Sequence, residues 1–241
     1  MNIRLFFTAC FSLLVASHIW AQSYDELPSI NPTAIYTTDE GEEENNNYSG
    51  NAPLLGRFYA NPSNIGNYTP HYEWRFTLLG ESQPYLTRYE EDTEYTFTKA
   101  GTHQIVLYAT FVNGQDTIAY TQEYWDEIGP ITVTISESKL DMPNAFSPNG
   151  DGINDIYKAK DGYQSIVEFK ACIFNRWGQK IYEWNDPAGG WDGTYKGSDV
   201  ADGVYFVLVE AKGADGRTYK IKRDVNLLRG FIESTSSGMT E

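Results

Sequence analysis

Short runs of aromatic and β-branched residues, separated by turns that contain Gly, Asn or Asp, make up most of this chain. Such residues fit the pleated, half-buried surface of a sheet, and Gly, Asn and Asp supply the backbone conformations of tight turns. After residue 21 no convincing amphipathic helix pattern appears. The sequence therefore predicts an all-β protein, with two small antiparallel β-sandwich domains in tandem after a signal peptide and an acidic linker.

The first 21 residues have the pattern of an export signal. Arg4 precedes the apolar run LFFTACFSLLVASHIW, which is too short to span a bilayer comfortably, and Ala21 offers a signal-peptidase site. An uncleaved anchor and a lipoprotein attached at Cys10 are the alternatives. We expect a cleaved signal peptide over 1–21 and an exported protein that is not integral to a membrane. Cys172 is then the only cysteine, so no internal disulfide is expected and the thiol is predicted to be a small buried hydrophobe.

The formal net charge of −15 is concentrated before residue 139. Residues 22–50 contain seven acidic and no basic side chains, and residues 51–138 contain eleven acidic and four basic ones. Nucleic acids and anionic lipids attract Lys and Arg clusters, so neither is an expected partner. The run DEGEEENNN and the nearby prolines predict an acidic disordered linker over 22–51.

Residues 52–138 contain five strand-like runs, HYEWRFTLL, EYTFT, QIVLYATFV, DTIAYTQEY and ITVTIS. Short strands at this spacing favour an immunoglobulin-like sandwich. The segments HYEWRF and YTFTKAGTHQIVLYATFVNGQDT resemble a PKD-type immunoglobulin-like domain. His103 lies in one of the apolar runs and is predicted to be a packed or edge residue.

Four blocks follow in the last third: FSPNGDGIND (146–155), NRWGQKIYEW (175–184), GWDGTYKG (190–197) and DGVYFVLVEAKGADGRTYKIKRDVNLLR (202–229). Each joins a turn to a strand-like run, which is the pattern of a β-hairpin. In this order they resemble the gliding motility-associated C-terminal domain of Bacteroidetes surface proteins, the type B sorting signal of type IX secretion. The resemblance implies a sorting domain over 139–230, followed by a flexible tail over 231–241.

The same resemblance implies export across the outer membrane to the cell surface or the medium. It also implies recognition by the type IX machinery and by an outer-membrane protein of the PorP/SprF kind. The tryptophans of the blocks, Trp177, Trp184 and Trp191, are predicted to pack at hairpin ends. The recognised positions would lie in the turns, at Asn149, Gly150, Asp151, Gly152, Asn154, Asp155, Asn175, Arg176, Trp177, Gly178, Trp191, Asp192, Gly193 and Arg229.

The segment SPNGDGINDIYK (147–158) partly matches a calcium-binding EF-hand loop. Asn149, Asp151 and Asp155 would supply oxygen ligands, but Ser147 replaces the usual first Asp and Lys158 stands where a bidentate Glu belongs. An Asx-rich turn, whose side chains bond their own backbone, is the alternative that we favour. No other cofactor is predicted.

The sequence contains no Gly-x-Ser-x-Gly elbow and no Cys/His metal spacing, so we expect no enzymatic activity. The expected function is export of a surface protein whose immunoglobulin-like domain has a structural or adhesive role. The alternative is an adhesin that binds a carbohydrate or a protein through a site on the 52–138 sandwich, where many tyrosines could be either core or ligand contacts.

Overall fold

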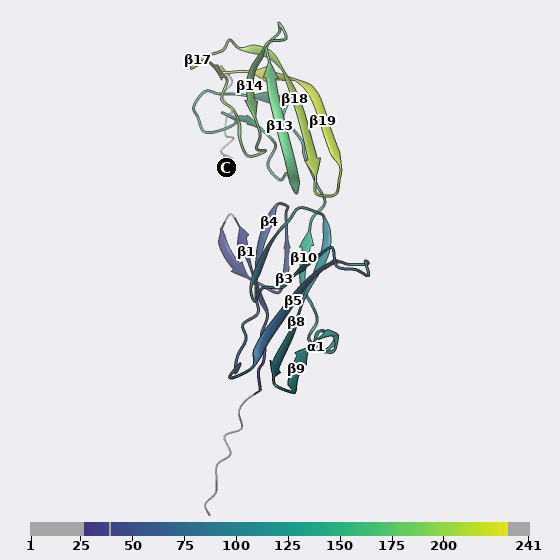
Figure 1. The fold of residues 1–241 in the computed structure, drawn as a ribbon. Helices are drawn as coiled ribbons and strands as arrows, with labels where there is room; N and C mark the ends of the chain where they lie inside the picture. Colours follow the sequence, from purple (N-terminus) through teal and green to yellow (C-terminus); the bar gives the residue numbers. More distant parts are fainter. Residues whose placement is uncertain (1–26, 39, 231–241) are drawn as a thin grey trace, which may run out of the picture.

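The computed structural model describes residues 27–38 and 40–230, which form two β domains placed end to end (Figure 1). The predicted signal peptide over 1–21 and the predicted tail over 231–241 lie outside these residues. Among the described residues, no helix has the length and apolar character needed to cross a membrane. The predicted all-β fold is confirmed.

The N-terminal domain, called the front domain below, consists of two packed sheets. The first has the order β2-β1-β4-β7 and contains β1 (Thr33–Thr38), β2 (Gly41–Glu44), β4 (Leu54–Tyr59) and β7 (Thr93–Phe97). The second has the order β3-β10-β8-β5-β6, with β9 also paired to β8; it contains β3 (Asn47–Gly50), β5 (Thr69–Leu78), β6 (Leu86–Arg88), β8 (Gly101–Asn113), β9 (Asp116–Tyr120) and β10 (Ile131–Ile135). All pairs are antiparallel except β3 with β10.

The predicted disordered linker over 22–51 is wrong, because β1, β2 and β3 lie within it. Ala34 and Tyr36 point into the core, while Glu42, Glu43 and Glu44 lie on β2, an exposed edge strand. Charged edge strands resist pairing with other chains, so this acidity is compatible with a folded strand. The asparagine run is also ordered: the Asn46 side chain accepts from the Ala34 N–H at 3.0 Å and donates to the Pro32 carbonyl.

Aromatic side chains fill the space between the two sheets of the front domain. Phe58 lies at the centre, with ring centroids 5.2 Å from Phe76, 6.0 Å from Trp74 and 6.2 Å from Phe97. All four side chains are fully buried. They come from β4, β5 and β7, where alternate residues face inward with the period of two expected of strands.

A short helix, α1 (Gln122–Ile128), follows β9, although the sequence predicted no helix and continued a strand through this segment. Its cause is a gap along one edge of β8. There β8 pairs with β10 up to Ile105 and with β9 from Ala109, which leaves the Leu107 carbonyl facing the gap. The buried Trp125 indole of α1 donates to this carbonyl at 2.8 Å and replaces a strand.

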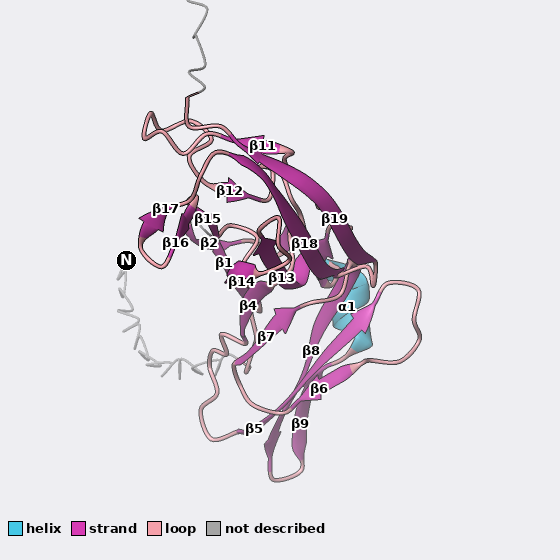
Figure 2. Ribbon diagram, turned by 90° about the horizontal axis from the view of Figure 1, so that it is seen from above, coloured by secondary structure: helices cyan, strands magenta, loops and turns pink. Residues whose placement is uncertain are grey.

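The C-terminal domain has one large sheet with the order β11-β19-β18-β13-β14 (Figure 2). Its strands are β11 (Ala145–Phe146), β13 (Ile166–Phe174), β14 (Lys180–Trp184), β18 (Gly203–Gly213) and β19 (Thr218–Leu227). Two small ladders accompany it, formed by β12 (Tyr157–Lys158) with β15 (Gly190–Trp191) and by β16 (Thr194–Tyr195) with β17 (Ser198–Asp199). The predicted turn at Asp215-Gly216 closes the β18–β19 hairpin, where Gly216 has φ +82°.

The β12–β15 ladder packs on the large sheet through Trp191. This fully buried ring lies 5.1 Å from Tyr205 of β18 and 5.3 Å from Phe146 of β11. Its indole N–H donates to the Thr194 carbonyl at 2.8 Å, so the polar atom of the ring is satisfied inside the domain. The core of this domain is thus centred on a residue of the third sequence block.

Candidate functional site

The first, third and fourth sequence blocks meet at the end of the C-terminal domain that lies far from the front domain, and the second block joins the third there through Gln179, which donates to the Tyr195 hydroxyl at 3.1 Å. Gly193 marks the meeting point, and its φ of +81° favours glycine. A Cβ atom there would lie 2.9 Å from Pro148 of the first block, 2.9 Å from the guanidinium of Arg229 and 3.2 Å from Leu227. Blocks far apart in the sequence are therefore in direct contact.

Arg229 ties the segment after β15 to the end of β19. Its guanidinium donates to the Gly193 carbonyl at 2.7 Å and to the Val200 carbonyl. The same group pairs with Asp202 at 3.3 Å and Asp199 at 3.4 Å. The side chain is only 21% exposed. Arg229, which the sequence offered as a recognised position, instead makes internal contacts that support this end of the domain.

The NRWG turn between β13 and β14 is built by Asn175. Its side-chain oxygen accepts from the backbone N–H groups of Trp177 and Gln179, both at 3.0 Å, and Gly178 supplies a φ of +76°. The Trp177 ring is not needed to hold the turn and is 77% exposed, with the Arg176 guanidinium 4.6 Å from its centroid. The prediction that Trp177 packs at a hairpin end is wrong.

The other two tryptophans follow the prediction, because Trp184 and Trp191 are both buried. Burial also removes Trp191 from the set of positions that a receptor could touch on the folded domain. The neighbouring Asp192 is exposed, but its carboxylate accepts from the Thr194 N–H at 2.9 Å and the Thr194 hydroxyl at 2.8 Å. In this block, the predicted recognition residues hold the fold.

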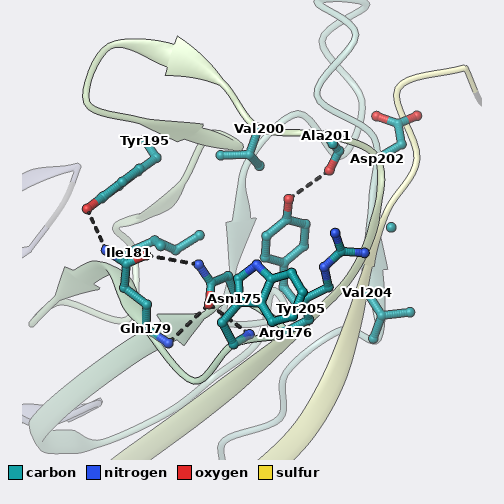
Figure 3. Close-up of a pocket in the computed structure, with 12 residues that line it drawn as sticks. Asn175, Arg176, Gln179, Ile181, Tyr195, Val200, Ala201, Asp202, Val204 and Tyr205 are labelled. Carbon is teal, nitrogen blue, oxygen red and sulfur yellow. Dashed lines mark hydrogen bonds between the residues drawn. The ribbon is translucent and has the colours of Figure 1, made fainter.

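A hollow of ≈ 340 Å³ opens beside the NRWG turn, between it and the segment leading into β18 (Figure 3). Ile181, Val200 and Tyr205 form apolar parts of its wall; the Tyr205 hydroxyl donates to the Ala201 carbonyl at 2.7 Å. Polar groups line the rest, at Asn175, Arg176, Gln179, Tyr195 and Asp202, with Trp177 also part of the lining. The sequence predicted Tyr195, the end of the recognised stretch 191–195, but not Gln179 or Asp202, although both lie within the four blocks.

The loop proposed for calcium is closed by Asp155. One carboxylate oxygen accepts from the Gly150 N–H at 2.7 Å and the other from the Gly152 N–H at 2.8 Å, and these bonds lower the pKa of Asp155. The Asn149 and Asp151 side chains accept from the N–H groups two residues later, as in Asx turns. Asn154 adopts a left-handed φ of +54°.

Within 27–38 and 40–230, no group of three or more His, Cys, Asp or Glu side chains is arranged to hold a metal ion. Calcium binding by Asn149, Asp151 and Asp155 stays a prediction. Their oxygens already accept from backbone N–H groups of the loop itself.

His103 of the front domain is a packed residue, as predicted. Its Nε2 lies 2.8 Å from the Lys99 carbonyl, which can only accept, so Nε2 carries the hydrogen. Nδ1 is then an acceptor for the Tyr85 hydroxyl at 2.8 Å. Burial lowers the pKa of His103.

A second hollow, also of ≈ 340 Å³, lies on the outer face of the front domain beside α1. The Arg75 guanidinium lies 4.0 Å from the centroid of Tyr108, whose hydroxyl donates to Gln122 at 2.7 Å. Gln122 in turn donates to Asp126 at 2.8 Å. The described residues contain no pair of exposed, coplanar tyrosines; the stacked pair is Tyr36 with Tyr48, of which Tyr36 is buried.

Comparison with known proteins identifies a family match for the C-terminal domain. A search of curated proteins found no match. Among solved structures, the chain is similar to dimeric latent PorU from Porphyromonas gingivalis, at 11% identity and a TM-score of 0.25 over 85% of this chain. The match spans 20% of that protein. Residues 140–223 match the CHU_C family. Over these residues the C-terminal domain matches a type IX secretion signal domain, which implies export to the cell surface or the extracellular space.

Proposed function

We propose that this chain is a non-enzymatic surface or secreted protein, and that the export machinery recognises it through the hollow beside the NRWG turn. The observation that carries the proposal is the exposure of Trp177. The other tryptophans of the blocks are buried, whereas this ring is 77% exposed at the hollow. A large aromatic side chain that the fold does not need is available to a partner.

The surroundings of Trp177 have the composition of a protein-binding hot spot. Such sites combine an aromatic or arginine anchor with an apolar centre and a polar rim. Arg176 stacks on the ring, Tyr205 and Ile181 contribute apolar wall, and Gln179 contributes a polar group. We infer that the partner that binds in this hollow is a segment of a type IX machinery protein, such as an outer-membrane protein of the PorP/SprF kind.

The front domain is proposed to be cargo with a structural or adhesive role, related to PKD-type immunoglobulin-like domains. Its clustered carboxylates support a non-catalytic role because they bond the fold itself. Asp92 accepts from the Ala60 N–H at 3.0 Å, and Glu90 accepts from the Tyr89 N–H and the Thr93 hydroxyl. A general acid or base needs a carboxylate free to reach substrate.

The test is an export assay on the full chain in a host with an active type IX system. Trp177→Ala is expected to leave protein inside the cell, whereas Tyr89→Ala, which removes a 70% exposed ring from the front domain, is expected to be exported normally. The melting temperatures of both purified variants should match the parent, because neither ring is in a core. Normal export of Trp177→Ala would rule out the hollow as the recognition surface. Export of a chain lacking 140–230 would rule out the sorting role altogether.

Ligand binding by the front domain is the second candidate function. The hollow beside α1 favours it, since Arg75, Tyr108 and Asp126 offer a cation, an aromatic ring and a carboxylate side by side. Glycan-array binding by the full chain, lost in Tyr108→Ala and kept in Tyr89→Ala, would support a carbohydrate ligand. Equal binding by both variants, or none by the parent, would exclude this hollow as a glycan site.

A further inference from the structure

The connection between the two domains is held by hydrogen bonds on both sides. The Ser136 hydroxyl donates to the Asn51 side-chain oxygen at 2.6 Å, so its own oxygen accepts from the Ser165 hydroxyl at 2.7 Å. The Ser165 oxygen also accepts from the Ala52 N–H at 3.1 Å. Ser165 belongs to the secretion signal domain, is buried, and has a left-handed φ of +47°. Its hydroxyl therefore meets its partners only across the boundary.

A second contact lies at the β18–β19 turn. Ala214, at the base of the secretion signal domain, is buried in the hydrophobic core of the front domain, and Val167 packs against the same core. The Ala214 carbonyl accepts from the Ala100 N–H of the front domain at 3.0 Å. The Ala214 N–H donates to the Ser165 carbonyl at 2.9 Å, which joins this contact to the first one.

Ser138, in the connecting segment, completes the joint. Its buried hydroxyl donates to Asp215 at 2.7 Å and accepts from the Tyr219 hydroxyl at 2.9 Å. Ser138 also fixes the identity of Gly213, because a Cβ atom there would lie 2.1 Å from the Ser138 oxygen. No real Cβ contact is that short, so the base of this domain is shaped around the connecting segment.

We propose that the front domain and the secretion signal domain are held together by a specific interface, and that the two domains form one rigid unit that unfolds in a single transition. Domains joined by a loose linker move relative to one another by default. Here Ser165 and Ala214 of the secretion signal domain bond to the front domain, and the buried Ser138 hydroxyl of the connecting segment bonds to the secretion signal domain. Separating the domains would leave these polar groups without their partners and expose apolar surface, which opposes opening.

The joint and the hollow beside the NRWG turn lie at opposite ends of β13 and β18. Ile166 pairs with Gly213 near the joint, and Phe174 pairs with Phe206 near the NRWG turn. A rigid unit would keep the β13–β14 turn, beside which the hollow lies, at the end of the molecule away from the front domain (Figure 1). Because the two sites are separate, damage to the joint and damage to the hollow can be measured independently.

The test uses the full chain and trypsin, which can cleave after Lys139. This residue is in the connecting segment, with its backbone bonded to Gln164 in both directions. The parent should give one calorimetric transition and resist cleavage at Lys139. Gly213→Ala should increase the cleavage rate at Lys139 by about tenfold or more, because opening of the joint becomes easier. Gly230→Ala is the control, because Gly230, like Gly213, has no left-handed φ, and a Cβ atom there would have no atom within 4 Å.

Ser165→Ala gives a second, milder variant in case Gly213→Ala does not fold. Alanine keeps the same backbone requirement as serine at φ +47° but lacks the hydroxyl, so faster cleavage at Lys139 would report the lost hydrogen bonds. Two separate transitions in the parent, or cleavage of the parent after Lys139 with both products folded, would overturn the proposal. So would cleavage in Ser165→Ala that is no faster than in Ser198→Ala, an exposed serine of β17.

Discussion

Replacement of Arg229 by alanine tests the claim that this residue supports the end of the secretion signal domain instead of contacting a receptor. The guanidinium donates to the carbonyls of Gly193 and Val200, and the side chain is largely enclosed. Alanine would remove the Arg229 donor from both carbonyls; the Gly193 carbonyl would keep only the Val200 N–H at 3.1 Å. The alanine side chain is also too short to fill the space beside Gly193 and Pro148.

The size of the effect follows from these two bonds. A hydrogen bond to a charged group contributes about 1.5 kcal/mol or more, so the loss of two corresponds to about 3 kcal/mol. The pairs with Asp199 and Asp202 add little, because both carboxylates are largely exposed and such pairs contribute about 0–1 kcal/mol. For a unit of this size that unfolds in one transition, 3 kcal/mol lowers the melting temperature by about 6–12 °C. Arg229→Lys can restore one of the two bonds and should lose about half as much.

The assay is thermal and urea unfolding of the full chain, followed by near-UV circular dichroism of the buried tryptophans. Arg88→Ala is the matched control, since Arg88 is exposed on β6, and it should stay within about 0.5 kcal/mol of the parent. A stable Arg229→Ala protein that fails in export would refute the structural argument and return Arg229 to the recognised positions.

Three further predictions concern single side chains. Millimolar calcium should leave the melting temperature unchanged, because both Asp155 oxygens already accept from backbone N–H groups; a rise that disappears in Asp155→Asn would establish a metal site. Stability should fall as pH drops below about 6.5, the unfolded pKa of histidine, since burial lowers the folded pKa of His103 and protonation would break its bond from Tyr85. Urea midpoints at pH 7.5 and 5.5 would show a smaller difference in His103→Phe, and an unchanged difference would contradict this. The Cys172 thiol should react slowly with iodoacetamide at pH 8 until the protein is unfolded, because burial and Glu183 raise its pKa; equal rates in both states would disprove its protection.

The strand pattern of the C-terminal domain could be predicted because its alternation is regular. In β19, Val225 and Leu227 face the core while Lys220, Lys222 and Asp224 are exposed, as their spacing indicated. The same logic failed at the N-terminus. The acidic composition there concealed β1, whose inward positions Ala34 and Tyr36 are only two residues, and Asn46 supplies a contact that no periodicity encodes.

The candidate site was predictable in its location but not in the roles of its residues. The resemblance implied that the recognised positions lie in the turns of the four blocks, and the structure brings these turns together at one end of the domain. Yet a Trp in a turn motif can pack or protrude, and only the three-dimensional arrangement separates the buried Trp191 from the exposed Trp177. The role of Arg229 depends on carbonyls of Gly193 and Val200, which lie far from it in sequence.

The parallel pairing of β3 with β10 has a mechanical consequence for a protein displayed outside a cell. The Cα register runs from Asn47 beside Thr132 to Gly50 beside Ile135, so both strands advance toward the joint. Tension between the secretion signal domain and the front domain pulls β10 along its own axis. The ladder hydrogen bonds from β10 to β3 and β8 lie across the strands. They therefore oppose this sliding of β10 all at the same time and do not open one after another. Strand order alone thus gives the front domain a direction in which it is hardest to pull apart.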